Sequence, residues 1–233
     1  MINKQSLFSA LSFLTIIRLK GYERFDAKES VYSFAYAGIL IGIGAAIVHM
    51  LLPPVAVVIY LCVITGFLHL DGLADTFDGL FSHKSKDKML EIMKDSRIGA
   101  MGAVAIVLCL LGKYNAVTNI ESVLIFAAIP AFSRYVMVLM MAFLPYVRQN
   151  GTGKAFVGGY DRRVFMQILP AEIILLVACG FIGFITINLL FVAIFIWLSV
   201  WYKKSLGGIT GDLLGASGEI METVLFIAAA RFC

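Results

Sequence analysis

The sequence predicts an all-α fold, a polytopic transmembrane helical bundle of about seven spans preceded by a short interfacial helix. The first observation is composition, since 61% of the residues are hydrophobic and only 15% are charged. A soluble domain carries roughly 25% charged residues. The second is the length of the hydrophobic runs, most of which are near the ~20 residues needed to cross a bilayer. We expect residues 1–233 to form a single integral-membrane catalytic domain.

The first hydrophobic run, residues 8–17, is too short to cross a bilayer. We expect it to lie at the membrane interface or to pack beneath the bundle. The charged stretch that follows, residues 18–30, is expected at the surface. No cleavable signal peptide is expected, because Arg18 and Lys20 interrupt the short apolar stretch that follows Lys4.

Seven longer hydrophobic runs are interpreted as spans. Pro53 and Pro54 separate the first two, because proline prevents continuation of a helix. The division between the fifth and sixth rests on Asn188 alone. Polar segments, residues 81–97 and 145–164, follow the second and fourth spans. The predicted spans are residues 33–52, 55–70, 98–117, 123–144, 165–185, 187–202 and 213–230.

The distribution of basic residues supports this topology. In a seven-span chain, the segments that carry Lys and Arg between or before the spans all fall on one side of the membrane, while the opposite loops carry none. The positive-inside rule places that side, with the N-terminus, in the cytoplasm. The residues concerned are Arg18, Lys20, Arg24, Lys28, Lys84, Lys86, Lys88, Lys94, Arg97, Arg148, Lys154, Arg162, Arg163, Lys203 and Lys204.

The segment "HLDGLADTFDGL", residues 69–80, places three aspartates at the end of the second span. With about 100° per helical residue, Asp71, Asp75 and Asp78 project within an arc of about 60°. Like charges at this spacing repel, and the cost rises near a membrane. A hard divalent cation such as Mg²⁺ would compensate them. The competing interpretation is a solvated acidic helix end.

Other charges lie deeper in the apolar runs. In "GGITGDLLGASGEIME", residues 207–222, Glu219 and Glu222 share one helix side and should face protein, a cation or water. Arg134 should face inward, either paired with a buried glutamate or contacting a phosphate. Lys113 is expected to extend toward the membrane surface. The four cysteines, Cys62, Cys109, Cys179 and Cys233, are expected to be small buried hydrophobic residues, without a disulfide framework or zinc site.

Four strings carry a resemblance that covers almost the whole chain. In order they are "FLTIIRL", "GFLHLDGLADTFDGL", "EIMKDSRIGAMGAVA" and "GGITGDLLGASGEIME". The chain is similar in them to the cobalamin synthase family, the adenosylcobinamide-GDP ribazoletransferases. The resemblance implies a Mg²⁺-dependent, multi-pass enzyme of the cell inner membrane with its active site toward the cytoplasm. It would join adenosylcobinamide-GDP to α-ribazole, or to α-ribazole 5′-phosphate, and release GMP in the last steps of cobalamin biosynthesis.

The resemblance also suggests catalytic residues. Asp71, Asp75 and Asp78 would hold Mg²⁺, and one of them would accept the hydroxyl proton. Asp95 would complete the metal or ribose shell, and Arg97 would contact a phosphate.

Further residues would bind the substrates. Lys94 and Arg134 would contact phosphates, and Asp212 would complete the metal or ribose shell. Ser96 would let the backbone approach the nucleotide. His69 would support the site as a neighbour of the metal ligands, or would be structural.

Two other functions compete with this one. A CDP-alcohol phosphotransferase of phospholipid synthesis also uses aspartates on membrane helices, but its "DGxxAR" pattern is absent from "DGLAD". An ion or solute transporter would show repeats and acids near the bilayer centre, whereas here the acids concentrate at one face. The expected partners are the two substrates and the lipid bilayer, with no nucleic acid. "GILIG", residues 38–42, allows a homo-oligomer contact, but packing within the chain is the use we expect for it.

Overall fold

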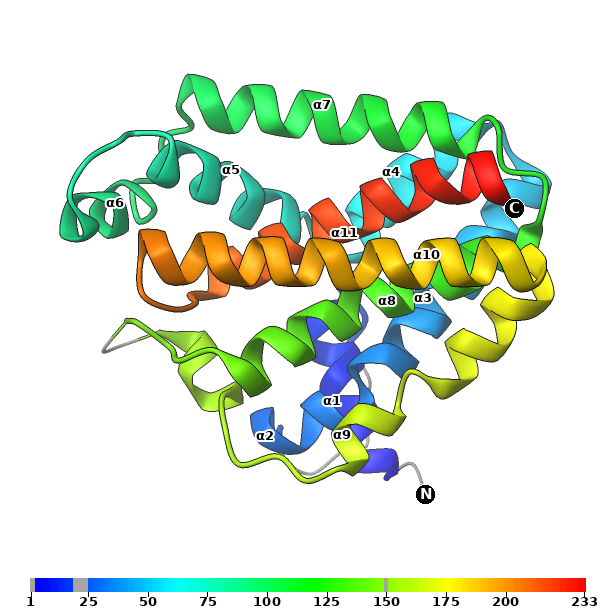
Figure 1. Ribbon diagram of the computed structural model, residues 1–233, viewed down its shortest axis with the longest axis horizontal. Helices are drawn as coiled ribbons and strands as arrows, with labels where there is room; N and C mark the ends of the chain where they lie inside the picture. Colours follow the sequence, from blue (N-terminus) through cyan, green and yellow to red (C-terminus); the bar gives the residue numbers. More distant parts are fainter. Residues whose placement is uncertain (1–2, 19–24, 149–150) are drawn as a thin grey trace.

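The computed structural model describes residues 3–18, 25–148 and 151–233, and within these ranges every regular element is a helix (Figure 1). Lys20 and Arg24 of the N-terminal basic group lie outside the described residues. The helices are α1 Lys4–Leu14, α2 Ala27–Ser30, η1 Val31–Ser33, α3 Phe34–Leu51, α4 Pro54–Ile64, α5 Leu68–Leu80, α6 Lys86–Ile92, α7 Ala100–Val117, α8 Val123–Phe143, η2 Thr152–Phe156, α9 Arg163–Met166, α10 Leu169–Ser205 and α11 Gly211–Phe232.

The all-α, multi-pass prediction is confirmed. Five helical segments are long and apolar enough to cross a membrane, or six if α4 and α5 together form one broken span. One of the five, Arg163–Ser205, covers two of the seven predicted spans. A straight helix of the 37 residues of α10 would measure about 55 Å, well beyond the ~30 Å of hydrocarbon.

The backbone of α10 breaks at Gly180, so the predicted division at Asn188 was wrong. Gly180 has φ 63° and ψ −176°, a conformation that glycine adopts without the steric cost of a Cβ atom. Asn188 remains helical. Its Nδ2 donates to Glu172 Oε2 (3.0 Å), which joins the two parts of α10 across the break.

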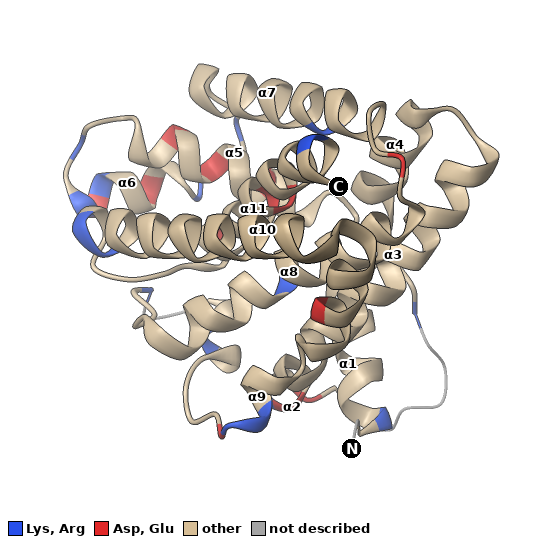
Figure 2. Ribbon diagram, turned by 45° about the vertical axis from the view of Figure 1, so that its right-hand side comes forward, with Lys and Arg blue, Asp and Glu red and all other residues tan. Residues whose placement is uncertain are grey.

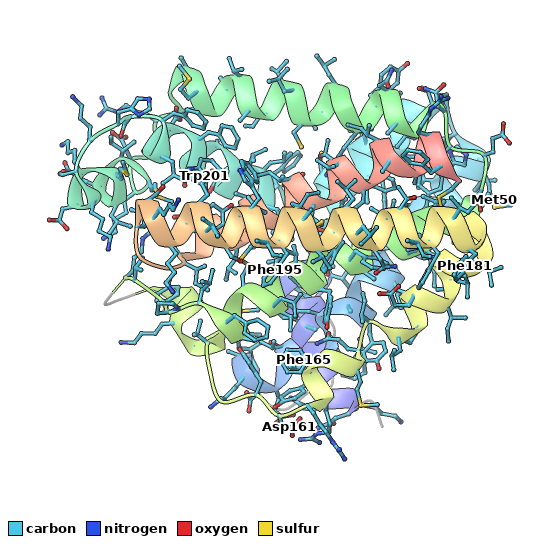
Figure 3. The ribbon with its side chains drawn as sticks, viewed as in Figure 1. Met50, Asp161, Phe165, Phe181, Phe195 and Trp201 are labelled. Atoms are coloured by element: carbon cyan, nitrogen blue, oxygen red, sulfur yellow. A yellow bond between two sulfur atoms is a disulfide. The ribbon has the colours of Figure 1, made fainter. Side chains whose placement is uncertain are left out.

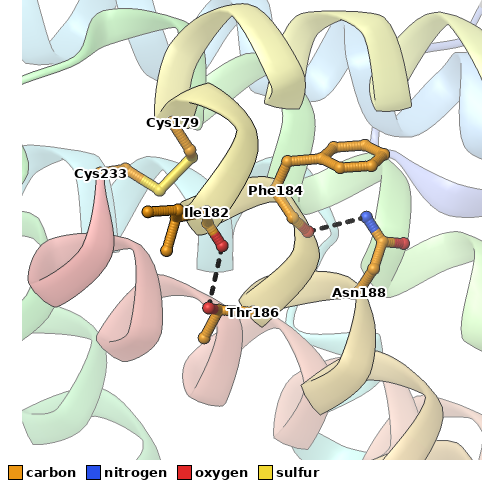
Figure 4. The surroundings of a disulfide bond; sticks show 6 residues. All are labelled: Cys179, Ile182, Phe184, Thr186, Asn188 and Cys233. Carbon is orange, nitrogen blue, oxygen red and sulfur yellow. Dashed lines mark hydrogen bonds between the residues drawn. A yellow bond between two sulfur atoms is a disulfide. The ribbon is translucent and has the colours of Figure 1, made fainter.

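A disulfide between Cys179 and Cys233 lies beside this break (Figure 4). The prediction of buried free cysteines holds for Cys62 and Cys109 and was wrong for this pair. The two cysteines are 54 residues apart in sequence. They meet because α10 bends at the same end of the bundle at which α11 ends (Figure 1).

The N-terminal helix packs beneath the bundle, which was one of the two expected placements. Ala10 and Leu14 of α1 are fully buried, and Ser6 Oγ donates to the carbonyl of Glu29 (2.6 Å). Just after α1, the amide of Ile16 donates to the carbonyl of Ile64 at the end of α4 (2.9 Å). The segment is therefore anchored to the second predicted span.

Helices α8 and α11 form the buried centre, and α10 covers them with a largely apolar outer face (Figure 3). The glycines of "GILIG" pack inside the chain. A Cβ atom on Gly38 would lie 2.5 Å from the Cα of Ala131 in α8, and Gly42 meets the backbone of the same helix at Ala127. The motif is thus used in packing α3 on α8.

Charged residues gather at the end formed by α5 and α6 and beside α2 and α9 (Figure 2). Helix α3 carries none along its 18 residues. This separation of charged ends from apolar shafts is typical of a multi-pass membrane protein.

Candidate active site

The acidic motif lies on a helix of its own because the chain turns sharply before it. Gly66 and Phe67 both have positive φ, 59° and 60°, and α4 and α5 are bent by 84° relative to each other. The second predicted span was expected to continue to Leu70, but its helix ends at Ile64. Such strained turns concentrate at functional sites, and this one aims α5 away from the shaft of α4.

Helices α5 and α11 cross at two glycines. A Cβ atom on Gly72 would lie 2.8 Å from the carbonyl oxygen of Asp212, and one on Gly215 would lie 3.2 Å from the Cα of His69. Small residues allow this close approach. The crossing brings Asp212 within electrostatic range of Asp71 and Asp75. The two acidic strings, more than a hundred residues apart, therefore meet in space.

A cleft of about 600 Å³ opens along α5 and faces the segment between α6 and α7. We call it the acidic cleft. Its other walls are apolar side chains of α4, α5 and α7, such as Leu70 and Ile106. The polar residues lining it are all ones that the sequence singled out: Asp71, Asp75, Lys94, Asp95, Ser96 and Arg97.

Two carboxylates in the acidic cleft are without a protein partner. In the described ranges, neither Asp71 nor Asp75 forms a hydrogen bond or ion pair with another side chain or with the backbone. Asp75 instead experiences the negative charges of Asp212, Asp71 and Asp78, which the positive charge of Arg148 offsets in part. Such a site favours a bound cation. Mg²⁺ usually takes one or two carboxylates together with waters and substrate phosphates, so this pair fits it.

The three aspartates of α5 do not form a preformed three-ligand site. Among the described residues, no group of three or more His, Cys, Asp or Glu side chains is arranged to hold a metal. Asp78 has another task. Its Oδ2 accepts from the amide of Gly99 (2.7 Å) and its Oδ1 from that of Gly102 (2.9 Å). It thereby caps α7, where a negative charge is favourable, and ties α7 to α5.

The loop before α7 supplies cations to the acidic cleft. Arg97 donates from Nη2 to Asp95 Oδ2 (2.6 Å) and from Nε to Oδ1 (3.0 Å). These bonds and the Arg97 amide lower the pKa of Asp95 to about 2. The Arg97 side chain is 86% exposed, so it remains accessible at the mouth of the cleft. Lys94 and Ser96 line the same wall.

Asp212 has a partner that sequence reasoning did not assign to the site. Arg148 Nη2 lies 2.6 Å from Asp212 Oδ2, and Thr210 caps α11 by accepting from the amide of Leu213 (3.2 Å). Arg148 had been considered only for topology. Its position in a polar loop gave no sign that it pairs with a carboxylate 64 residues further along the chain.

The buried charges form a separate cluster deeper in the bundle. Lys113 Nζ donates to Glu219 Oε2 (2.6 Å) and to Glu222 Oε1 (2.7 Å), and Arg134 pairs with Glu222. Lys113 is only 1% exposed, so the prediction that it extends to the membrane surface was wrong. Of the two alternatives for Arg134, the structure shows the pairing with a buried glutamate. The cluster lines neither the acidic cleft nor the cavity described next.

His69 is 2% exposed and lines a smaller cavity of about 120 Å³ with Asp71 and Asp212. The acidic cleft and this cavity use different faces of α5 and share Asp71. Of the ten predicted site residues, Asp78 and Arg134 alone line neither space.

Comparison with known proteins gives consistent matches. The family model described as cobalamin-5-phosphate synthase matches residues 6–230. A relative from Klebsiella pneumoniae named adenosylcobinamide-GDP ribazoletransferase is 34% identical over 244 residues, covering 96% of this chain and 98% of the relative. One of the same name from Escherichia coli is 36% identical over 241 residues, covering 95% and 97%. No solved structure matches the chain.

Proposed function

Because the chain belongs to the cobalamin-5-phosphate synthase family, we propose that it transfers the cobinamide-linked phosphoryl group of adenosylcobinamide-GDP to α-ribazole or its 5′-phosphate. The observation that carries this proposal is the acidic cleft. It gathers two unpartnered carboxylates, Asp71 and Asp75, beside the cationic side chains of Lys94 and Arg97. A diphosphate with a divalent cation needs both kinds of group.

The reaction exchanges the phosphoanhydride bond of the donor for a new phosphate ester bond to the acceptor. A ribose hydroxyl oxygen of the acceptor bonds to the phosphorus that carries cobinamide, and the bond from that phosphorus to the bridging oxygen breaks. GMP leaves with the bridging oxygen, and the hydroxyl proton is lost to a base. The reaction has two products. One is GMP, and the other is a phosphodiester, which is adenosylcobalamin or its 5′-phosphate.

Asp71 and Asp75 would hold Mg²⁺ in this proposal. The ion would neutralise the diphosphate and the charge that develops on the leaving oxygen. Asp78 serves as a positioning residue, since both of its oxygens accept hydrogen bonds from the start of α7. That contact fixes the two helices that form the walls of the acidic cleft.

The loop residues would orient the donor. Arg97 carries a planar guanidinium that can contact two phosphate oxygens at once, and Lys94 adds a second positive charge from the same wall. Arg97 would exchange its contacts with Asp95 for contacts with the substrate. The positive-inside distribution supports a site that opens to the cytoplasm, where nucleotide-linked substrates occur.

Activity measurements on the purified protein in nanodiscs test this function. With adenosylcobinamide-GDP, ribazole and Mg²⁺ we expect stoichiometric formation of GMP and the joined product. Release of CMP from a CDP-alcohol, or solute flux without turnover, would favour the competing functions instead.

A further inference from the structure

The cavity that contains His69 is lined by more aromatic side chains than the acidic cleft. Three phenylalanines from separate parts of the chain line it: Phe13 from α1, Phe34 from α3 and Phe156 from η2. The ring centroids of Phe13 and Phe156 are 4.4 Å apart. Met137 and Met141 of α8 complete the apolar wall. We call this space the aromatic cavity.

The motif "FLTIIRL" contributes a residue to the aromatic cavity and none to the acidic cleft. Phe13 begins "FLTIIRL", one of the four strings that carry the family resemblance. The backbone bond from Ile16 to Ile64 (2.9 Å) holds this string against the turn that precedes α5. The motif therefore places an aromatic ring next to the acidic helix.

The opposite end of the aromatic cavity is polar, and one of its polar side chains forms no hydrogen bond in the described structure. His69 is 2% exposed, and neither of its ring nitrogens has a hydrogen-bond partner in the described structure. Buried polar groups are rarely left unpaired, so these nitrogens indicate a missing ligand. Asp71 and Asp212 lie at the same end. Among the described residues, no Lys or Arg lines the cavity, which disfavours an anionic group inside it.

The dimensions suit one part of a nucleoside. A cavity of about 120 Å³ is slightly smaller than the ~150 Å³ cavity that accommodates benzene in another protein. It would therefore admit about one six-membered ring. Methionine and phenylalanine walls favour flat, apolar heteroaromatic groups.

We propose that the aromatic cavity receives the six-membered ring of the heteroaromatic base of the acceptor nucleoside, while the rest of the nucleoside, including the ribose, lies at its polar end beside His69 and Asp71. This inference rests on the proposed function. The diphosphate donor would occupy the acidic cleft, so that acceptor and donor approach Asp71 from different faces of α5. A ribose hydroxyl at the polar end would then give His69 a hydrogen-bond partner and lie where the two spaces meet.

Kinetics of a matched pair of variants test the assignment. Phe156→Leu removes an aromatic wall, and we expect it to raise the KM for ribazole about fivefold while the KM for adenosylcobinamide-GDP stays within about twofold. Phe132→Leu is the control, because Phe132 is equally buried but packs on Phe191 of α10. It should change neither constant. A rise in the donor KM alone, or no change in the ribazole KM, would overturn the proposal.

Inhibition of the unaltered protein provides a test that needs no variant. Dimethylbenzimidazole, the free base of ribazole, should inhibit competitively against ribazole and not against the donor. Competition with the donor would overturn the inference. If the protein released no GMP at all, the proposed function would fail. Calorimetry would then still test the cavity, because dimethylbenzimidazole should bind the unaltered protein and bind Phe156→Leu about fivefold more weakly. Equal binding to both would refute it.

Discussion

Replacing Lys113 with methionine should destabilise the bundle by about 3–5 kcal/mol, the range for removing one partner of a buried ion pair. The structure gives the reason. Lys113 is 1% exposed and bonds to two carboxylates at 2.6 and 2.7 Å. The cluster of Lys113, Arg134, Glu219 and Glu222 is neutral when all four are charged. Lys113→Met leaves two buried carboxylates with a single guanidinium.

The free energy of unfolding can be measured by titrating the detergent-solubilised protein with a denaturing detergent. The unfolding constant should rise by a factor of about 100 to 5,000. Lys88→Met is the matched control, because Lys88 pairs with Glu91 at 2.8 Å on an exposed helix, and surface pairs contribute about 0–1 kcal/mol. The double variant Lys113→Met/Glu219→Gln should recover part of the loss. The reasoning is refuted if Lys113→Met changes the free energy no more than Lys88→Met does.

Three further predictions concern the site and the topology. Asp75→Asn should abolish GMP release while leaving membrane insertion intact, and a variant with the unaltered rate at low Mg²⁺ would exclude a metal role. Asp78→Ala should cost about 1–2 kcal/mol of stability through loss of the helix cap and lower kcat, without raising the Mg²⁺ concentration needed for half-maximal rate; a raised requirement would make Asp78 a metal ligand. In a background without exposed cysteines, Asn119→Cys should react with an impermeant thiol reagent added from outside, whereas Lys86→Cys should be spared; the reverse pattern would invert the topology.

The grouping of the acidic cleft could be predicted because its residues are close in sequence. Asp71 and Asp75 are one helical turn apart, and the run from Lys94 to Arg97 follows on the next polar segment. Helical periodicity was enough to group the two aspartates, whereas the family resemblance added Lys94, Asp95 and Arg97 to the site. The role of Asp78 could not be predicted, since its partners are backbone amides at the start of α7 and leave no pattern in the side chains.

The remaining differences arise from contacts between distant segments. Hydropathy identifies an apolar run but does not show where it bends, so the break was assigned to Asn188 when Gly180 carries it. A lysine near a helix end can reach the interface or pair with a neighbour, and the choice for Lys113 depends on which face of α11 lies opposite. The pairing of Arg148 with Asp212 and the aromatic cavity likewise depend on tertiary packing alone.

The central claim is that Asp71 and Asp75 hold a divalent cation that in turn holds the diphosphate of the donor. Electron–nuclear double resonance of Mn²⁺ bound to the nanodisc-reconstituted protein, with adenosylcobinamide-GDP present, tests it most directly. The account predicts a protein-bound Mn²⁺ signal coupled to phosphorus, lost when both aspartates are replaced by asparagine. A signal of the same strength in that double variant, or bound Mn²⁺ without phosphorus coupling, would contradict it.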